Sequence, residues 1–245
     1  MSTPRFYCDA TLGPGVQLDL PENAAHHASR VLRLRAGDEA MLFNGDGNDY
    51  LVDLLRVSKE GVTAKVKSWQ SIDRESPLKV TLAQAISSGD RMDFTLQKAV
   101  ELGVGAVQPL AAERSVVKLS GERAERRREH WQNVVISACE QSGRAAVPDV
   151  AMPTPMLHWL GSMPDFSLKL MLSPVADRTL HDLPPPDGHI CLLIGCEGGF
   201  APTEIQAAES MGFTPVRLGP RVLRTETAAL TALSAIQTLW GDFRR

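Results

Sequence analysis

The sequence predicts an α/β protein in which a small β-rich domain, residues 1–72, precedes a larger domain, residues 73–245. Two observations support this division. Glycine and proline punctuate short apolar runs in the N-terminal part, and a polar segment ending in proline, residues 71–77, closes it. After that segment, strand-like and helix-like stretches alternate to the end of the chain. Such alternation predicts a mostly parallel sheet covered by helices.

In the first domain, turn signals at Gly13–Gly15, Gly37–Asp38, Asn44–Gly47 and Gly61 separate the apolar runs. The runs predict strands at residues 40–43, 50–54 and 62–66, interrupted by one helix over residues 23–34. Turns at this density are typical of a small barrel.

In the second domain, apolar runs predict strands at residues 80–86, 104–110, 168–172, 190–194 and 215–218. Helical periodicity predicts helices at residues 90–102 and 122–140. A third helix begins at Pro202 and ends at Gly212. Thr225 is the predicted N-cap of the last helix, residues 226–240.

Composition limits the possible functions. The 245 residues carry a formal net charge of −3, so any contact with nucleic acid must depend on locally gathered basic residues. The four cysteines include no CxxC pair and no zinc-ligand spacing, and Cys191 lies in an apolar run that suits a core. No metal is therefore expected. The sequence has neither a signal peptide nor a membrane-spanning run, which predicts a cytoplasmic protein with reduced thiols.

Two special loops follow predicted strands, at the edge of the sheet where α/β proteins bind ligands. The first, Gly195–Gly199, matches neither a dinucleotide fingerprint nor a P-loop, and Glu197 would repel a phosphate. A ligand without phosphates, such as S-adenosylmethionine, fits better. The second loop, Gly219–Thr225, carries two arginines and enters a helix. Taken singly, each loop could equally well be a structural connection, whereas together they favour a binding site.

The motifs of these loops resemble the RsmE family of SPOUT-superfamily methyltransferases, which methylate N3 of a uridine in 16S ribosomal RNA. The resemblance extends over essentially the whole chain. Its motifs are Leu193–Gly199, Leu218–Ala228, Asp73–Pro77, Gln97–Val104, Glu113–Ser115, Ala138–Arg144, His27–Arg33, Gly37–Asp38 and Phe43–Gly45. Cys196 departs from the family, which usually has proline at this position, and the change restores a backbone N–H and frees φ.

The resemblance implies a PUA-like RNA-binding barrel followed by a SPOUT domain with a deep trefoil knot, a rare exception to the rule against threaded chains. It implies a homodimer, with 16S rRNA, within the 30S subunit, as substrate. It also implies S-adenosylmethionine as the cofactor. The residues expected to bind the cofactor are Leu172, Ser173, Pro174, Ile194, Gly195, Glu197, Gly198, Leu218, Gly219, Leu223, Thr225, Thr227 and Ala228.

Methylation of uridine N3 requires loss of a weakly acidic imide proton, so a cation beside the base would help by stabilising the anion. Arg221 and Arg224 are the candidates for this role. Glu226 is a candidate base or arginine orienter. An acid in the first turn of a helix is also accounted for by the helix dipole alone. The candidate phosphate contacts are Arg5, Arg30, Arg33, Arg114 and Arg144.

Two other functions are compatible with part of the sequence. SPOUT 2′-O-methyltransferases acting on tRNA or rRNA resemble this chain at the glycine loop, but their last motif differs from Leu223–Ala228. A non-catalytic RNA-binding or ribosome-assembly factor could keep the fold, although the intact ligand loops argue against it.

Overall fold

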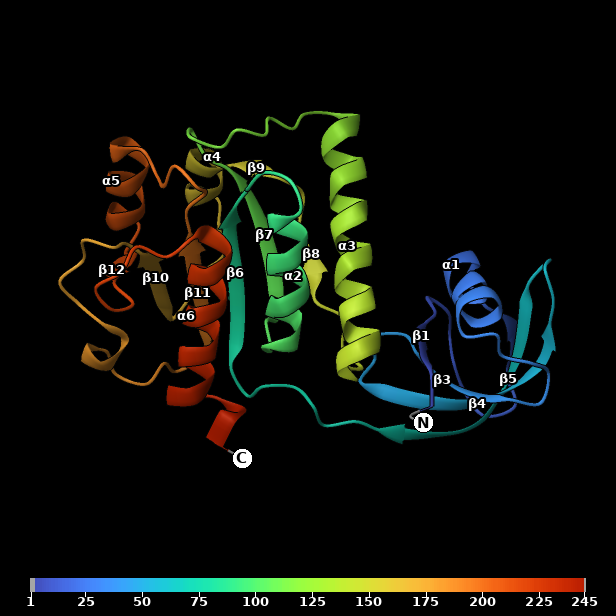
Figure 1. Ribbon diagram of the computed structural model, residues 1–245. Helices are drawn as coiled ribbons and strands as arrows, with labels where there is room; N and C mark the ends of the chain where they lie inside the picture. Colours follow the sequence, from blue (N-terminus) through green and yellow to red (C-terminus); the bar gives the residue numbers. More distant parts are fainter. Residues whose placement is uncertain (1–2, 245) are drawn as a thin grey trace. The chain divides into compact units, whose positions relative to one another are not determined.

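The computed structural model describes residues 3–244, which form two compact units (Figure 1). The first unit contains the chain up to Glu75 together with Cys139–Val147. The second contains Ser76–Ala138 and the chain from Pro148 onward. The segment 139–147 therefore clusters with the N-terminal sheet, whereas a division made by sequence alone, at residue 72, assigns it to the second domain.

The first unit is built on a mixed five-stranded sheet. Its strands are β1 (Arg5–Tyr7), β2 (Gln17–Asp19), β3 (Glu39–Phe43), β4 (Asn48–Val57) and β5 (Val62–Ser71), in the order β1-β3-β4-β5-β2. β1 pairs with β3 in parallel, and the other neighbouring strands are antiparallel. Alternate residues such as Val62, Ala64 and Val66 face a single core. The three strands predicted from the sequence are confirmed, and β1 and β2 are additional.

The helix predicted over residues 23–34 is shorter and changes type along its length. α1 covers Glu22–His26, and a π-helical turn follows over His27–Val31. The Leu32 N–H donates to the His27 carbonyl at 3.0 Å, five residues back. Arg33 then takes a φ of 56°, which ends the helix. Hydrophobic periodicity cannot distinguish a single π turn from a continuing α-helix.

The second unit contains a parallel sheet in the order β12-β10-β11-β6-β7-β8, with β9 also paired to β7. Every one of these pairs is parallel. The strands are β6 (Lys79–Ala85), β7 (Ala106–Ala111), β8 (Asp149–Val150), β9 (Thr154–Pro155), β10 (Leu168–Leu172), β11 (His189–Ile194) and β12 (Thr214–Val216). The predicted α/β class with a mostly parallel sheet is confirmed.

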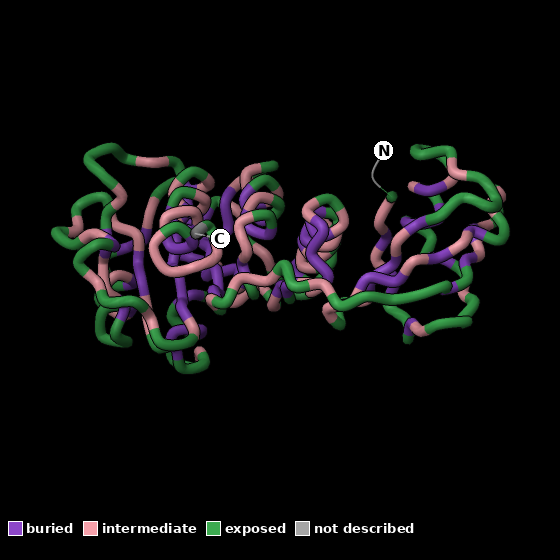
Figure 2. Tube along the Cα trace, turned by 90° about the horizontal axis from the view of Figure 1, so that it is seen from below, coloured by how far each residue is buried: buried purple, intermediate pink, exposed green. Residues whose placement is uncertain are grey.

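Helices cover both faces of this sheet. They are α2 (Arg91–Glu101), α3 (Glu122–Ser142), α4 (Met156–Leu160), α5 (Pro202–Ser210) and α6 (Thr225–Leu239), with short 3₁₀ turns at Leu180–Asp182 and Asp242–Arg244. α2 and α6 pack side by side, and α4 packs on α5 (Figure 1). Ala83 and Ala85 of β6 share a core with α4 and α5, so alternation turns Leu82 and Gln84 toward the face of α2 and α6. Figure 2 shows the buried residues gathered along the strands of this unit.

The buried groups include four free cysteines: Cys8, Cys139, Cys191 and Cys196. Cys191 belongs to the core of the second unit, as predicted. Burial raises the pKa of the Cys139 thiol to about 12, so this thiol stays protonated near neutral pH. Among residues 3–244, no helix combines the length and apolar character needed to cross a membrane.

Candidate active site

A cavity of about 620 Å³ lies where β10, β11 and β12 end and α6 begins. Leu172, Ile194 and Val216 are the last residues of these three strands. β11 lies between β10 and β6. From β6 the chain continues to β7 on one side of the sheet, and from β11 it continues to β12 on the other side, so the direction of the connections reverses between β11 and β6. The cavity therefore occupies the position at which α/β proteins bind ligands, and its size is within the usual range for small-molecule sites.

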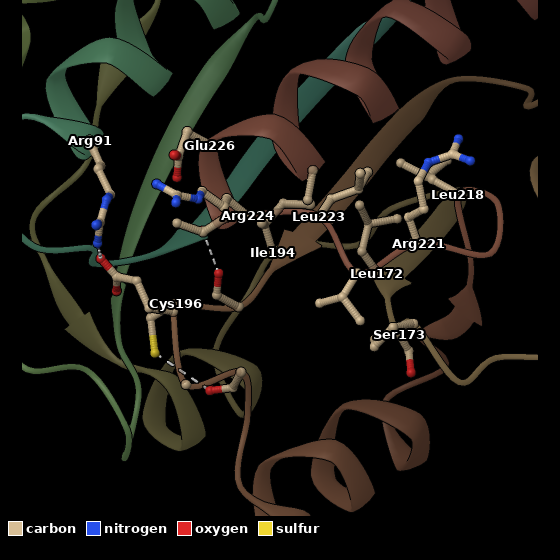
Figure 3. A pocket seen from close by; sticks show the side chains of 18 of the residues that line it. Arg91, Leu172, Ser173, Ile194, Cys196, Leu218, Arg221, Leu223, Arg224 and Glu226 are labelled. Atoms are coloured by element: carbon tan, nitrogen blue, oxygen red, sulfur yellow. Dashed lines mark hydrogen bonds and ion pairs between the residues drawn. The ribbon is translucent and has the colours of Figure 1, made fainter.

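One side of the cavity is apolar. Leu172, Ile194, Leu218 and Leu223 point into it (Figure 3). Gly195 follows Ile194 directly, and a Cβ atom at this position would lie 3.1 Å from the Gly199 Cα. A side chain here would push against the Gly199 backbone, so glycine lets the loop fold closely on itself and leaves its backbone open to a ligand.

Glu197 is a carboxylate whose charge is already balanced. Its Oε1 accepts hydrogen bonds from the Ser88 N–H and hydroxyl, each at 3.0 Å, and from Arg91 at 2.7 Å. Burial alone would raise its pKa, but the hydrogen bonds from backbone N–H groups, Arg91 and the Ser88 hydroxyl outweigh burial and lower the pKa to about 2. Glu197 is therefore ionised and ties the glycine loop to the start of α2.

Arg114 holds the other side of the same loop. Its Nη1 donates to the Gly198 carbonyl at 3.0 Å. A Cβ on Gly198 would lie 3.2 Å from the Arg114 Cβ, so the arginine covers the loop closely. Arg114 was predicted as an RNA contact. The structure shows it exposed, with one guanidinium nitrogen bonded to the loop.

Thr225 connects the two ligand loops, and its predicted role as N-cap is wrong. Arg224 is the N-cap residue and makes no side-chain cap bond within the described chain, while Thr225 is the first residue of α6. The Thr225 hydroxyl donates to the Gly195 carbonyl at 2.6 Å. The hydroxyl oxygen accepts from the Gln84 side-chain amide at 3.0 Å, so both of its hydrogen bonds are tertiary and neither is a local capping bond.

The two candidate arginines point in opposite directions. Figure 3 shows the Arg224 guanidinium directed toward Glu226, on the same side of the cavity as Arg91. Arg221 is directed away, beyond Leu218, and its Nη2 lies 3.9 Å from where a Cβ on Gly219 would be. The Oε2 atom of Glu226 is buried and has no hydrogen-bond partner among residues 3–244. Arg224 and Glu226 therefore form one polar corner, and Arg221 lies outside it.

Most of the predicted cofactor residues line this one cavity. They are Leu172, Ser173, Pro174, Ile194, Gly195, Glu197, Gly198, Leu218, Leu223, Thr225 and Ala228. Gly219 and Thr227 do not line it. The assignment of all these residues to the cofactor stays a prediction.

Cys196, Gly199 and Val222 also line the cavity and lie within the two predicted loops, although they were not named singly. The sequence-based prediction missed Arg91 and Val216, which line the cavity as well. Arg91 could have been found from its position, because it opens the helix that follows the predicted strand 80–86. Cys196 is 5% exposed, and its thiol donates to the Gly199 carbonyl at 3.5 Å.

Two of the predicted phosphate contacts need correction. Arg5 is ion-paired with the buried Asp49 and donates to the Arg144 carbonyl at 3.1 Å. Arg144 is itself buried, and its guanidinium binds the Glu75 carboxylate. These side chains stabilise the first unit and are poorly available to RNA. In contrast, Arg30 and Arg33 are exposed.

Comparisons with known proteins agree with this fold. A family model described as an RNA methyltransferase domain matches residues 74–237, and one described as an RNA methyltransferase PUA domain matches residues 20–67. These matches define the class of protein as an RNA methyltransferase with a PUA domain. The ribosomal RNA small subunit methyltransferase E of Buchnera aphidicola subsp. Schizaphis graminum is 35% identical over 239 residues, which cover 98% of this chain and 97% of the relative.

Solved structures show the same relationship. The ribosomal RNA small subunit methyltransferase E of Neisseria gonorrhoeae, bound to S-adenosyl methionine, has a TM-score of 0.92 and 46% identity, covering 99% of this chain and 100% of the other. A putative methyltransferase from Legionella pneumophila, in complex with the cofactor SAM, has a TM-score of 0.95 and 42% identity over the same shares. The chain therefore belongs to the ribosomal RNA small subunit methyltransferase E family, the RsmE family whose motifs its sequence carries.

Proposed function

We propose that this protein is an S-adenosylmethionine-dependent methyltransferase that methylates N3 of a uridine in the 16S rRNA of the small ribosomal subunit. The observation that carries the proposal is the cavity itself. It joins an apolar slot, built by the ends of three parallel strands, to a polar corner containing Arg224 and Glu226. Family membership supports methylation of small-subunit rRNA, and the resemblance to RsmE motifs supports N3 of a uridine as the target.

The residues of the slot fit S-adenosylmethionine. Leu172, Ile194, Leu218 and Leu223 offer apolar surface for a flat heterocycle, and the loop at Gly195 offers backbone groups for its polar edge. A phosphate-bearing ligand is disfavoured because the glycine loop matches neither a dinucleotide fingerprint nor a P-loop. When bound, S-adenosylmethionine would supply an electrophilic methyl group on a sulfonium centre.

Arg224 and Glu226 would act on the uracil. N3 becomes nucleophilic when its imide proton leaves, and Glu226 has a carboxylate oxygen, unpartnered within the described chain, that can accept this proton. The charge left on the ring spreads to O2 and O4, where the Arg224 guanidinium would stabilise it. Arg221 points away from this corner and is the weaker candidate.

The RNA would be held by exposed cations on each unit. Arg30 and Arg33 are the candidates on the first unit, and Arg114 is the candidate on the second. N3 is hidden in a paired uridine, so the target nucleotide must be unpaired or extruded. We propose 16S rRNA within the 30S subunit as the substrate, which implies a cytoplasmic role.

Two further properties belong to the same proposal. A homodimer is supported by highly exposed apolar side chains beside the cavity, Val175 and Val222. A deep trefoil knot in the second unit is supported by family membership.

The decisive experiment has two parts. Isothermal titration with S-adenosylmethionine tests the donor site, and absence of detectable binding would remove the enzymatic proposal. Methylation of 30S subunits from a strain lacking the enzyme, followed by identification of the product nucleoside, tests the reaction. N3-methyluridine is the expected product, whereas 2′-O-methyluridine would establish the alternative SPOUT activity.

A further inference from the structure

A buried glutamine lies directly beneath the donor cavity without lining it. Gln84 is on β6 and is completely buried. Its Nε2 donates to the Thr225 hydroxyl oxygen at 3.0 Å and to the Ala85 carbonyl at 3.0 Å. The Thr225 hydroxyl donates in turn to the Gly195 carbonyl at 2.6 Å. A short chain of hydrogen bonds therefore connects the middle of the sheet to both ligand loops.

Donor and acceptor chemistry fixes the direction of this chain. The Ala85 carbonyl can only accept, so the amide end that faces it must be the NH₂ group. The same NH₂ group faces Thr225, whose hydroxyl oxygen must then accept from it. Because a hydroxyl has a single proton, that proton remains for the Gly195 carbonyl. Gln84 thus holds the Thr225 hydroxyl oxygen from one side while the hydroxyl proton is directed to the Gly195 carbonyl.

The other end of the amide suggests why glutamine is present. The Oε1 atom of Gln84 is buried and has no hydrogen-bond partner in the part of the chain that the structure describes. An orphaned buried acceptor destabilises a fold, so an apolar side chain of similar length would serve stability at least as well. The role of glutamine at this position must therefore lie in the hydrogen bonds of its NH₂ group, which holds Thr225, and through Thr225 in the position of Gly195.

We propose that Gln84 is a positioning residue for the methyl-donor site: it orients the Thr225 hydroxyl, which locks the Gly195 carbonyl and so fixes the glycine loop against the start of α6. This inference rests on the proposed function, because it assumes that S-adenosylmethionine binds between these loops. Gln84 itself does not line the cavity proposed to hold the donor.

The test compares Gln84→Met with the wild-type protein in S-adenosylmethionine titrations and in thermal unfolding. Methionine keeps the length of the side chain and removes both polar ends. The dissociation constant for S-adenosylmethionine should rise about fivefold or more, the size of effect expected from one lost hydrogen bond. Tm should be unchanged or higher, because the orphaned acceptor is gone. A fall in Tm with unchanged affinity would show that Gln84 serves the fold alone and would overturn the proposal.

Gln237 provides a matched control. It is also completely buried, but both ends of its amide are satisfied, by the Leu102 carbonyl at 3.1 Å and the Ser76 hydroxyl at 2.7 Å. Gln237→Met should therefore lower Tm and leave the affinity of the folded protein for S-adenosylmethionine unchanged.

A double-mutant cycle with Thr225→Val tests the connection itself. If Gln84 acts through Thr225, the double variant should bind S-adenosylmethionine no more weakly than the weaker single variant. Additive losses would show that the two side chains act separately and would overturn the proposal. Failure of the wild-type protein to bind S-adenosylmethionine would instead count against the proposed function, so the two failures are distinguishable.

Discussion

At the scale of single residues, the two arginines of the second loop make different contributions because the chain turns between them. Arg224 is the N-cap of α6 and points to Glu226, while Arg221 points out of the polar corner. Arg224→Ala should lower the methylation rate of 30S subunits by about tenfold or more if it stabilises the uracil anion. The affinity for S-adenosylmethionine should change little.

Arg221→Ala is the matched control for this experiment, because it removes the same charge from the same loop. We expect a smaller loss of rate, measured under single-turnover conditions with saturating S-adenosylmethionine. Equal losses in the two variants would assign the effect to the positive charge of the loop as a whole and would remove Arg224 from its specific role.

Glu197 gives a prediction about pH. Its folded pKa of about 2 is below the ordinary value of 4.5, so its ionised form stabilises the folded state above pH ~4.5, and this stabilisation is lost as the pH falls toward 2. Glu197→Gln should therefore lower Tm at pH 6, and the difference from the wild-type protein should narrow as the pH is lowered toward 3. A difference in Tm that is constant from pH 6 to pH 3 would contradict the assigned pKa.

At the scale of elements, the glycine loop depends on close backbone packing rather than on flexibility. Gly195→Ala would bring a Cβ to 3.1 Å from the Gly199 Cα and force the loop outward. We expect this variant to bind S-adenosylmethionine about tenfold more weakly or worse, with an unchanged circular dichroism spectrum. Gly161→Ala, whose new Cβ would lie 3.6 Å from the His158 carbonyl oxygen, should bind normally. Normal binding by both variants would show that the loop tolerates a side chain.

The elements also show how far the sequence alone can be interpreted. The strand at residues 168–172 is confirmed to the residue, because a short, mostly apolar run between polar flanks is typical of a buried strand. Thr225 was misassigned because its true partner, the Gly195 carbonyl, is thirty residues away in the sequence. Arg5 and Arg144 were misassigned for the same reason, since Asp49 and Glu75 are distant in sequence. Local patterns predict strands and loops, whereas the partner of a polar side chain is decided by the tertiary fold.

At the scale of the whole molecule, two apolar side chains beside the cavity are highly exposed to solvent. Val175 is 86% exposed and Val222 is 82% exposed. Val175 adjoins Pro174, and Val222 itself lines the cavity, so both lie beside the proposed donor site. Two highly exposed apolar side chains beside one cavity are a candidate surface for another protein to cover.

The proposed homodimer predicts that this rim is the interface. Val222→Glu should shift the protein from dimer to monomer in sedimentation velocity experiments, because a charge buried without a partner strongly opposes association. The monomer should also bind S-adenosylmethionine more weakly, since the loop of Arg221–Arg224 would lose the surface that holds it. Leu157→Glu is the matched control: Leu157 is 54% exposed on α4 and does not line the cavity, so this variant should remain dimeric. A wild-type protein that sediments as a monomer at micromolar concentration, or a Val222→Glu variant that remains dimeric, would contradict the placement of the interface at the donor site.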